Sequence, residues 1–242
     1  MRAIQRRPLS EGAQAALLAL TTDVVNHPDP SKKAQTSWDH KPKSTFDEVR
    51  AVLEDMAPGL QRCMYCEDSA GTDIEHFRPK SVYPALAFCW ENYLLACSHC
   101  NSNYKRSSFP VDPQGEPLLI DPTSPADDPV KHLLLTVADF KFQPLDAKGE
   151  ATIEVFGLNA RSPLVRGRKN TLNALVALLR RYDQQHKDDP SGAAETKACI
   201  VEFPFSGVLF WLVKLTQGEF VPAKIDAETV RIVRAHQVAT WL

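Results

Sequence analysis

The 242-residue sequence lacks several features that would place a protein in a broad class at once. It has no excess of basic charge, because 28 Lys and Arg against 30 Asp and Glu give a formal net charge of −2. Any attraction to phosphate must therefore come from local patches. Its strongest apolar run, near residues 207–213, is far too short to span a membrane. The first residues carry charge but no apolar segment with a cleavage site, so we expect no secretory signal.

Cysteine is too scarce for a disulfide scaffold, with six residues in a chain of this length. Four of the six form two Cys-x-x-Cys pairs, which suit a reducing compartment better than an oxidising one. Hydrophobic and charged contents of 43% and 24% are ordinary for a folded soluble protein. We therefore expect a cytoplasmic protein.

The chain also lacks an internal repeat and a low-complexity tail, and its length suits one medium-sized domain. We expect a single domain over residues 1–242, of the α+β class and mostly helical. It would consist of an N-terminal helical part (1–60), a small cysteine-rich β module (61–110) and a mainly helical C-terminal part (111–242). The flanking helices would surround the module.

Local patterns predict the elements of the N-terminal part. The Ala- and Leu-rich segment 10–25, with Ser10 as its N-cap, predicts a helix. Residues 27–43 hold three prolines and several lysines without apolar periodicity, which predicts a loop. Segment 44–56 begins with a sequence resembling a capping box and continues with a helical apolar stripe. Pro58-Gly59 would end that helix.

In the middle of the chain we expect a short extended stretch around residues 74–77, between the two cysteine pairs. A helix carrying Asn101 and Lys105 would follow the second pair. The proline-rich segment 109–128 predicts extended chain, with a short strand at 118–120.

The C-terminal part begins with the alternating, β-branched segment 152–156, which predicts a strand. A helix over 162–182 would have proline at its first position. After a loop around 188–192 we expect two or three more helices, the last over 226–241.

The two Cys-x-x-Cys pairs predict a structural zinc site. A two-residue spacer lets both sulfurs of a pair face one point, and four thiolates close a tetrahedral site. The 30 residues between the pairs are acceptable if they form their own hairpin. A redox Cys-x-x-Cys is a weaker alternative because the βαβ setting that it needs is missing. The lone Cys89 and Cys199 have apolar neighbours and are expected to be buried structural thiols. The four expected zinc ligands are Cys63, Cys66, Cys97 and Cys100.

The segment between and after these pairs contains residue types that a structural zinc site does not need. Hydrolysis of a phosphodiester requires an activated water and a counter-charge on the transition state. A histidine whose pKa is close to neutral pH can take the proton of the water. A hard cation held by oxygen ligands can supply the counter-charge. His76 with Glu75, followed by Asn92 and Asn101, provides these residue types in order. A nuclease is therefore the favoured interpretation.

These residues belong to one longer pattern, Cys63-x-x-Cys66, Glu75-His76-Phe77-x-Pro79, Asn92-x-Leu94, Cys97-x-x-Cys100-Asn101 and Lys105. The pattern resembles the HNH endonuclease motif of the ββα-metal superfamily, in which a β-hairpin and a helix hold one catalytic ion. The resemblance implies that His76 is the general base and that Asn92 fixes the loop and orients the histidine. It also implies that Glu75 and Asn101 bind a catalytic Mg²⁺ or Mn²⁺, and that Lys105 contacts phosphate. This chain departs from the usual motif in having Glu before the histidine, Asn as the last motif residue, and the lysine four residues after it.

A further resemblance extends over residues 38–182. It is to the HNH nuclease subunit of Septu-type anti-phage defence systems (PtuB-like), and it implies an ABC-type ATPase as partner. The segments that carry it, besides the motif, are Cys-x-Tyr-Cys-Glu at 63–67, Trp90-x-Asn92, Phe109-Pro110, Leu119-Ile120-Asp121-Pro122 and Gly157-Leu158-Asn159.

Several basic side chains are candidates for contact with nucleic acid. Arg78 and Lys80 follow His76 closely and are placed to touch phosphates beside the scissile one. Residues 161–182 contain six basic residues and no acidic one, which fits either a phosphate-binding face or a solvated helix face. Asp73 would share a strand face with the residue before the histidine; it is either an acid that supports the metal ligands or a solvated turn residue, and we favour the latter.

Three functional hypotheses follow. The first is a metal-dependent HNH endonuclease that cuts DNA with one catalytic ion, within an anti-phage complex. The second is a zinc-stapled module that binds nucleic acid or protein without catalysis. The third keeps the chemistry but has RNA as substrate, and the sequence leaves DNA and RNA open because base and metal act on the phosphate in both.

Overall fold

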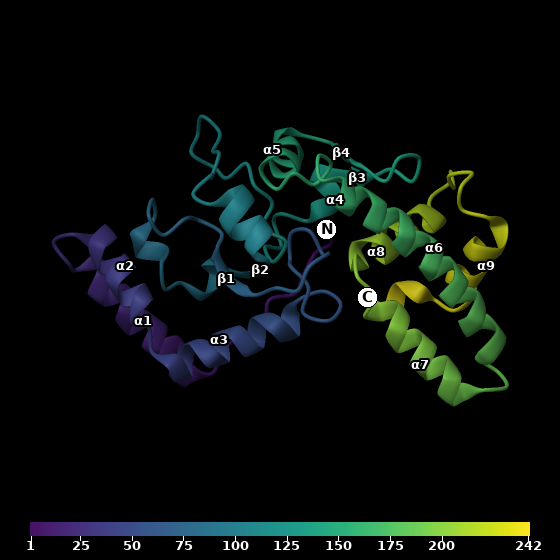
Figure 1. Ribbon diagram of the computed structural model, residues 1–242, viewed down its shortest axis with the longest axis horizontal. Coiled ribbons are helices and arrows are strands. Elements are labelled where there is room, and N and C mark those ends of the chain that lie inside the picture. The colour runs from purple at the N-terminus through teal and green to yellow at the C-terminus, as the bar shows by residue number, and fades with distance from the viewer.

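The computed structural model describes residues 1–242 as a mostly helical α+β fold with two small antiparallel hairpins. Figure 1 shows α1–α3 at one end of an elongated molecule, α6–α9 at the other, and the hairpins between them. The predicted fold class is confirmed. A continuous cluster of buried apolar residues includes side chains from all three of these regions. The division into parts at residues 60 and 110 stays a prediction.

The N-terminal helices are α1 (Glu11–Val25), α2 (Pro30–Asp39) and α3 (Lys43–Met56). Ser10 caps α1 as predicted, since its hydroxyl accepts from the Ala13 amide. The loop predicted over 27–43 is wrong over most of its length. Asp29 accepts from the Lys32 amide and Pro30 occupies the first turn, so the proline starts a helix there.

The first hairpin consists of β1 (Asp73–His76) and β2 (Tyr93–Ala96), with Asp73 opposite Ala96 and His76 opposite Tyr93. Two short 3₁₀ helices, η1 (Pro84–Leu86) and η2 (Trp90–Asn92), lie in the connection between the strands. A π-helix, η3 (His99–Lys105), follows β2. The extended stretch and the helix predicted here are both confirmed.

The second hairpin, β3 (Leu133–Leu135) and β4 (Phe142–Pro144), lies between two helices, α4 (Pro129–His132) and α5 (Ala147–Val155). The strand predicted over 152–156 is wrong because most of that segment belongs to α5. Asp146 caps the helix by accepting from the Gly149 amide. The strand predicted over 118–120 does not form either: the Ile120 amide donates to the buried Thr152 hydroxyl, 3.0 Å away, instead of to another strand.

The C-terminal helices are α6 (Ser162–Gln185), α7 (Pro190–Val201), α8 (Ser206–Gln217) and α9 (Ala227–Ala235), followed by η4 (Val238–Trp241). The helix predicted from residue 162 is confirmed. The last predicted helix is split in two, because Gln237 adopts a left-handed conformation with φ 49°.

Two further observations concern cysteine burial and helix length. Cys199 is exposed and Cys89 is half-buried, so the expectation of buried thiols is wrong for Cys199. None of the helices has by itself the length and apolar character of a membrane span; α7 and α8 meet that test only as a pair, bent by 102°.

Candidate functional site

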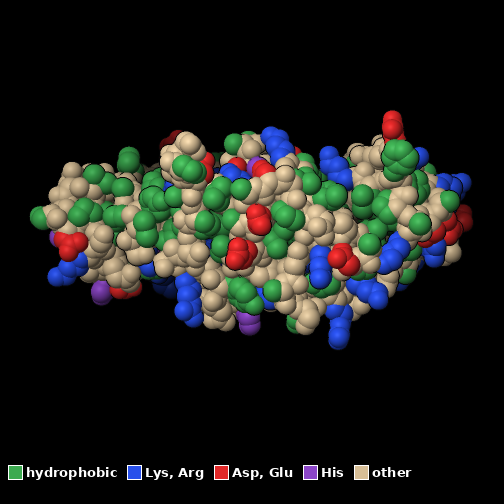
Figure 2. Space-filling view, turned by 90° about the horizontal axis from the view of Figure 1, so that it is seen from above, with side chains coloured by type: hydrophobic (Ala, Val, Ile, Leu, Met, Phe, Trp, Pro, Cys, Tyr) green, Lys and Arg blue, Asp and Glu red, His purple; other side chains and the backbone are tan.

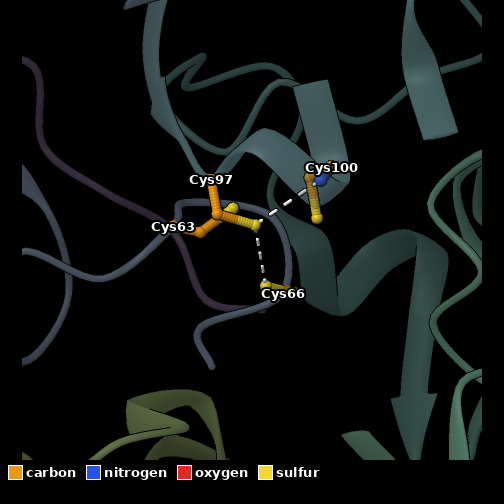
Figure 3. A group of neighbouring side chains, drawn as sticks. All are labelled: Cys63, Cys66, Cys97 and Cys100. Carbon is orange, nitrogen blue, oxygen red and sulfur yellow. Dashed lines mark hydrogen bonds between the residues drawn. The ribbon is translucent and has the colours of Figure 1, made fainter. Parts of the chain in front are cut away.

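Four buried cysteines from the two Cys-x-x-Cys turns form a compact cluster. Their sulfur atoms all lie within 4.8 Å of one another, and Figure 3 shows them converging from the two turns. The Cys66 and Cys97 sulfurs are 3.8 Å apart. A tetrahedral ion with Zn–S bonds of about 2.3 Å separates its sulfurs by about 3.8 Å. The donor set therefore fits a structural zinc ion, held by Cys63, Cys66, Cys97 and Cys100.

Local backbone conformation and a nearby cation support this cluster. Glu67, directly after the first pair, has a positive φ of 59°, and its amide donates to the Cys63 carbonyl at 2.9 Å. Hydrogen bonds from neighbouring thiols, that of Cys100 first, lower the pKa of Cys66 to about 6. The Arg161 guanidinium lies 3.5 Å from the Cys100 sulfur. Its positive charge offsets part of the negative charge of a four-thiolate site.

His76, at the end of β1, is held in one orientation and kept uncharged. Its Nε2 lies 2.9 Å from the Ala87 carbonyl oxygen, which can only accept, so Nε2 carries the hydrogen. The Nδ1 atom has no hydrogen-bond partner in the protein, so it keeps its lone pair. Burial lowers the pKa of His76 to about 4, and three nearby lysines act in the same direction. The ring is therefore a neutral base at pH 7.

Asn92 ties the loop after His76 to the second strand. Its Oδ1 accepts from the Arg78 amide at 2.7 Å, and its Nδ2 donates to the carbonyls of Arg78 and Leu86, each at 3.0 Å. The asparagine is buried. These contacts hold the loop that carries the Ala87 carbonyl, and thus position the His76 ring indirectly.

The expected metal ligands Glu75 and Asn101 contact different partners. Asn101 Nδ2 donates to Asp73 Oδ2 at 3.0 Å, whereas the Glu75 carboxylate lies 2.5 Å from the Lys105 ammonium. The strand register explains why Asn101 meets Asp73. Asp73 lies opposite Ala96, and η3 starts three residues after Ala96, so its first turn lies beside Asp73. The acid that sequence reasoning favoured as a solvated turn residue is therefore half-buried and bonded to Asn101.

Lys105 does not occupy the position predicted for a phosphate contact. Its side chain is fully buried, paired with Glu75, and donates to the His76 carbonyl at 2.8 Å. Residues two apart in a strand share a face, so Glu75 lies on the same side of β1 as Asp73. This side faces η3, where Glu75 meets Lys105. The contact of Lys105 with phosphate stays a prediction, since in the structure this ammonium is bonded inside the protein. Burial raises the pKa of Glu75, while the charge of Lys105 opposes that rise.

The oxygen donors on this face suit a hard cation better than a transition metal. Asp73, Glu75 and Asn101 offer carboxylate and amide oxygens on the η3 side of β1, so the residue types fit Mg²⁺ or Mn²⁺. However, the ligand atoms of Asp73, Glu75 and His76 do not come within 4.8 Å of one another as a group. Of the two expected ligands, Asn101 contacts Asp73 and Glu75 contacts Lys105, so their binding of a catalytic ion stays a prediction.

Three cations in this part of the protein have no acidic partner in ion-pairing distance: Arg78, Lys80 and Lys41. The ring centroids of Trp38 and His76 are 4.3 Å apart. The ammonium groups of Lys41 and Lys80 lie 4.6 and 5.7 Å from the Trp38 centroid. Arg78 lies over the rings of Tyr83 and Phe109. Local positive charge is thus present despite the negative net charge.

Sequence reasoning missed Trp38 and Lys41 because it assigned them to a loop far from the cysteine module. The signal that could have found them is the Asp29-Pro30 pair, which begins α2. In space the end of this helix covers His76.

Half of the six basic residues in 161–182 contact groups within the protein: Arg161, Arg168 and Arg180. Arg168 is buried and donates to the Phe140 and Leu158 carbonyls, and Arg180 pairs with acidic residues before and in α9. Only Arg166, Lys169 and Arg181 of the six are exposed. Figure 2 shows no continuous area of a single charge on the face that it presents. A solvated helix face is therefore favoured over a phosphate-binding one.

The fold and site define a hairpin and helix joined by four clustered cysteines that fit a zinc ion, with a neutral histidine and unpaired cations, set among flanking helices. No protein-family model matches the chain. Over 109 residues the chain is 35% identical to Septu protein PtuB of Bacillus thuringiensis, and it is homologous to that protein over this stretch. The match covers 43% of this chain and 39% of the relative, less than half of each. The predicted resemblance to PtuB-like proteins is confirmed.

Proposed function

We propose that this protein is a metal-dependent endonuclease of the HNH type that hydrolyses phosphodiester bonds of DNA. The observation that carries the proposal is the state of His76, a neutral imidazole with one nitrogen fixed and the other free. A structural histidine would need no such arrangement beside three unpaired cations. The similarity to Septu protein PtuB supports the same conclusion.

We assign the following roles to the residues of the site. Nδ1 of His76 accepts the proton of the attacking water, and Asn92 keeps the loop behind the ring in place. Arg78, Lys80 and Lys41 bind phosphates of the strand. A divalent ion, when bound, would stabilise charge on the scissile phosphate. The oxygen donors to hold it are Asn101 with its partner Asp73, and Glu75 on the same face of β1.

The partner in this proposal is an ABC-type ATPase within an anti-phage defence complex. This part rests on the similarity to a Septu protein and not on a surface of this chain. A gene for a large protein with a Walker A motif in the neighbouring reading frame would support it. Failure of the two gene products to co-purify would argue against it.

Cleavage assays test the activity directly. Plasmid DNA and RNA are incubated with wild type and with His76→Ala, with Mg²⁺ or Mn²⁺ and after chelation. We expect ion-dependent cutting of DNA by wild type and a loss of about 10²–10⁴-fold in His76→Ala, the usual contribution of a general base. His99→Ala is the matched control, since this exposed histidine in the second cysteine pair has no role in the proposal.

The outcomes separate the three hypotheses. Cleavage by His76→Ala at the wild-type rate would refute the assignment of the base. Nucleic-acid binding by wild type without cleavage under any ion would favour a binding module. Cutting of RNA but not DNA would keep the mechanism and change the substrate.

A further inference from the structure

A second group of metal-ligating side chains lies far from the hairpin, where the end of α6 meets the end of α9. Asp183 lies in the last turn of α6, His186 is the C-cap of this helix three residues later, and His236 directly follows α9. One ligand atom of each lies within 4.8 Å of the other two. All three residues are half-buried. Nothing in the proposed nuclease chemistry uses them.

The contacts within this group orient the carboxylate and leave a lone pair on His186. Asp183 Oδ2 accepts from Arg231 at 2.6 Å, which fixes the carboxylate, while Oδ1 lies 2.6 Å from His236 Nε2. His186 Nδ1 lies 3.1 Å from the Asp183 backbone carbonyl and so carries the hydrogen, leaving Nε2 with its lone pair. The two imidazole centroids are 4.5 Å apart. Metal-binding histidines and carboxylates usually make such supporting hydrogen bonds. Here His186 Nδ1 donates to a backbone carbonyl, and Asp183 Oδ2 accepts from Arg231.

Two imidazoles and one carboxylate are a donor set for zinc and related divalent transition ions, and not for Mg²⁺ or Ca²⁺. Such an ion would take the place of the proton shared by Asp183 and His236. The Arg231 side chain is about half exposed, so it can turn toward solvent to relieve repulsion from the ion. Three protein ligands leave one position for water, so binding should be weaker than at the four cysteines.

We propose that Asp183, His186 and His236 bind a divalent transition ion, such as zinc, that links the end of α6 to the end of α9. The site is independent of the cysteine cluster and of nuclease activity. Because an ion bound only to the folded state stabilises it, zinc should raise the melting temperature beyond the effect of filling the cysteine site.

The test counts zinc ions bound by the full chain whose cysteine site is already filled. Equilibrium dialysis against Zn²⁺ should give one further ion per chain for wild type. His186→Ala and His236→Ala should each weaken the binding of this ion about tenfold or more. Loss of a supporting hydrogen bond already weakens metal binding by at least about tenfold, and loss of a ligand should weaken it further. The matched control is His132→Ala: His132 pairs with Asp146 at 2.6 Å in the same way but has no third donor nearby.

Circular dichroism checks that each variant is folded, and two variants are used so that one remains informative if the other does not fold. Binding of no further ion by wild type would overturn the proposal. So would a further ion bound with wild-type affinity by a folded His186→Ala or His236→Ala, or lost equally in His132→Ala.

Discussion

At the scale of the residue, the ion pair between Lys105 and Glu75 fixes how η3 lies on the hairpin. Both side chains are almost completely buried, and their charged atoms are 2.5 Å apart. Lys105 also donates to the His76 carbonyl, so one ammonium joins the helix to the strand that carries the base. A buried pair adds little net stability, but removal of one partner leaves a buried charge without compensation.

We therefore expect Lys105→Met to destabilise the fold by about 3–5 kcal/mol, measured by denaturant unfolding. Adding Glu75→Gln should recover part of the loss, because the double variant no longer buries a lone carboxylate. Lys43→Met is the control: Lys43 pairs with Asp47 in the open, so the change should stay within about 1 kcal/mol. Equal losses for the two lysine variants would show that the buried pair has no special role.

At the scale of the element, α2 and the turn into α3 complete the surroundings of His76. The end of α2 places Trp38 against the histidine ring, and the turn that follows places Lys41 over the face of the indole. A cation held on an aromatic ring has fewer conformations to lose when it binds phosphate. The N-terminal helices thus contribute to the proposed site, although they lie outside the cysteine module.

Lys41→Ala should weaken DNA binding and reduce the slope of log affinity against log salt by about 0.9, the release of one counterion. Binding is measured by fluorescence anisotropy without added Mg²⁺, so that cleavage does not interfere. Lys43→Ala, two residues away and exposed, should leave the slope almost unchanged. If the two variants share one slope, Lys41 does not contact phosphate.

At the scale of the whole molecule, the cysteine cluster lies where the hairpin meets the C-terminal helices. Tyr65, inside the first cysteine pair, stacks on Phe156 with ring centroids 3.9 Å apart. Arg161, directly before α6, lies beside Cys100, and the Glu67 carbonyl accepts from the Phe205 amide, next to α8. Loss of the metal should therefore affect more than the hairpin.

We expect removal of zinc, by chelation or by Cys97→Ser, to lower the melting temperature of the whole chain in one transition. Zinc binding in small domains is coupled to folding by on the order of 10 kcal/mol. Added zinc should restore the chelated wild type but not the variant. Cys199→Ser, at the exposed cysteine outside the cluster, should melt like wild type with its zinc retained. A separate melting of the C-terminal helices, unchanged by zinc, would contradict this coupling.

Features that depend on residues close together in the chain could be predicted from the sequence. A two-residue spacer brings two thiols to one point, so the zinc cluster could be predicted from spacing. The Ser10 cap and the apolar stripe of α6 likewise act within a few helical turns. The resemblance carried by the motif indicated His76 and Asn92 before their contacts were known.

Contacts between side chains far apart in the chain depend on how the helices and strands pack. The β-branched segment from Thr152 lies in α5, where the Thr152 hydroxyl on a buried helix face accepts from the Ile120 amide, a contact over 32 positions. The register of the two strands, and not the spacing of the motif, explains why Asn101 contacts Asp73 and Lys105 contacts Glu75. Trp38 reached His76 through packing of a helix that local patterns did not predict. Such contacts depend on where elements lie in space, and no short segment of sequence contains that information.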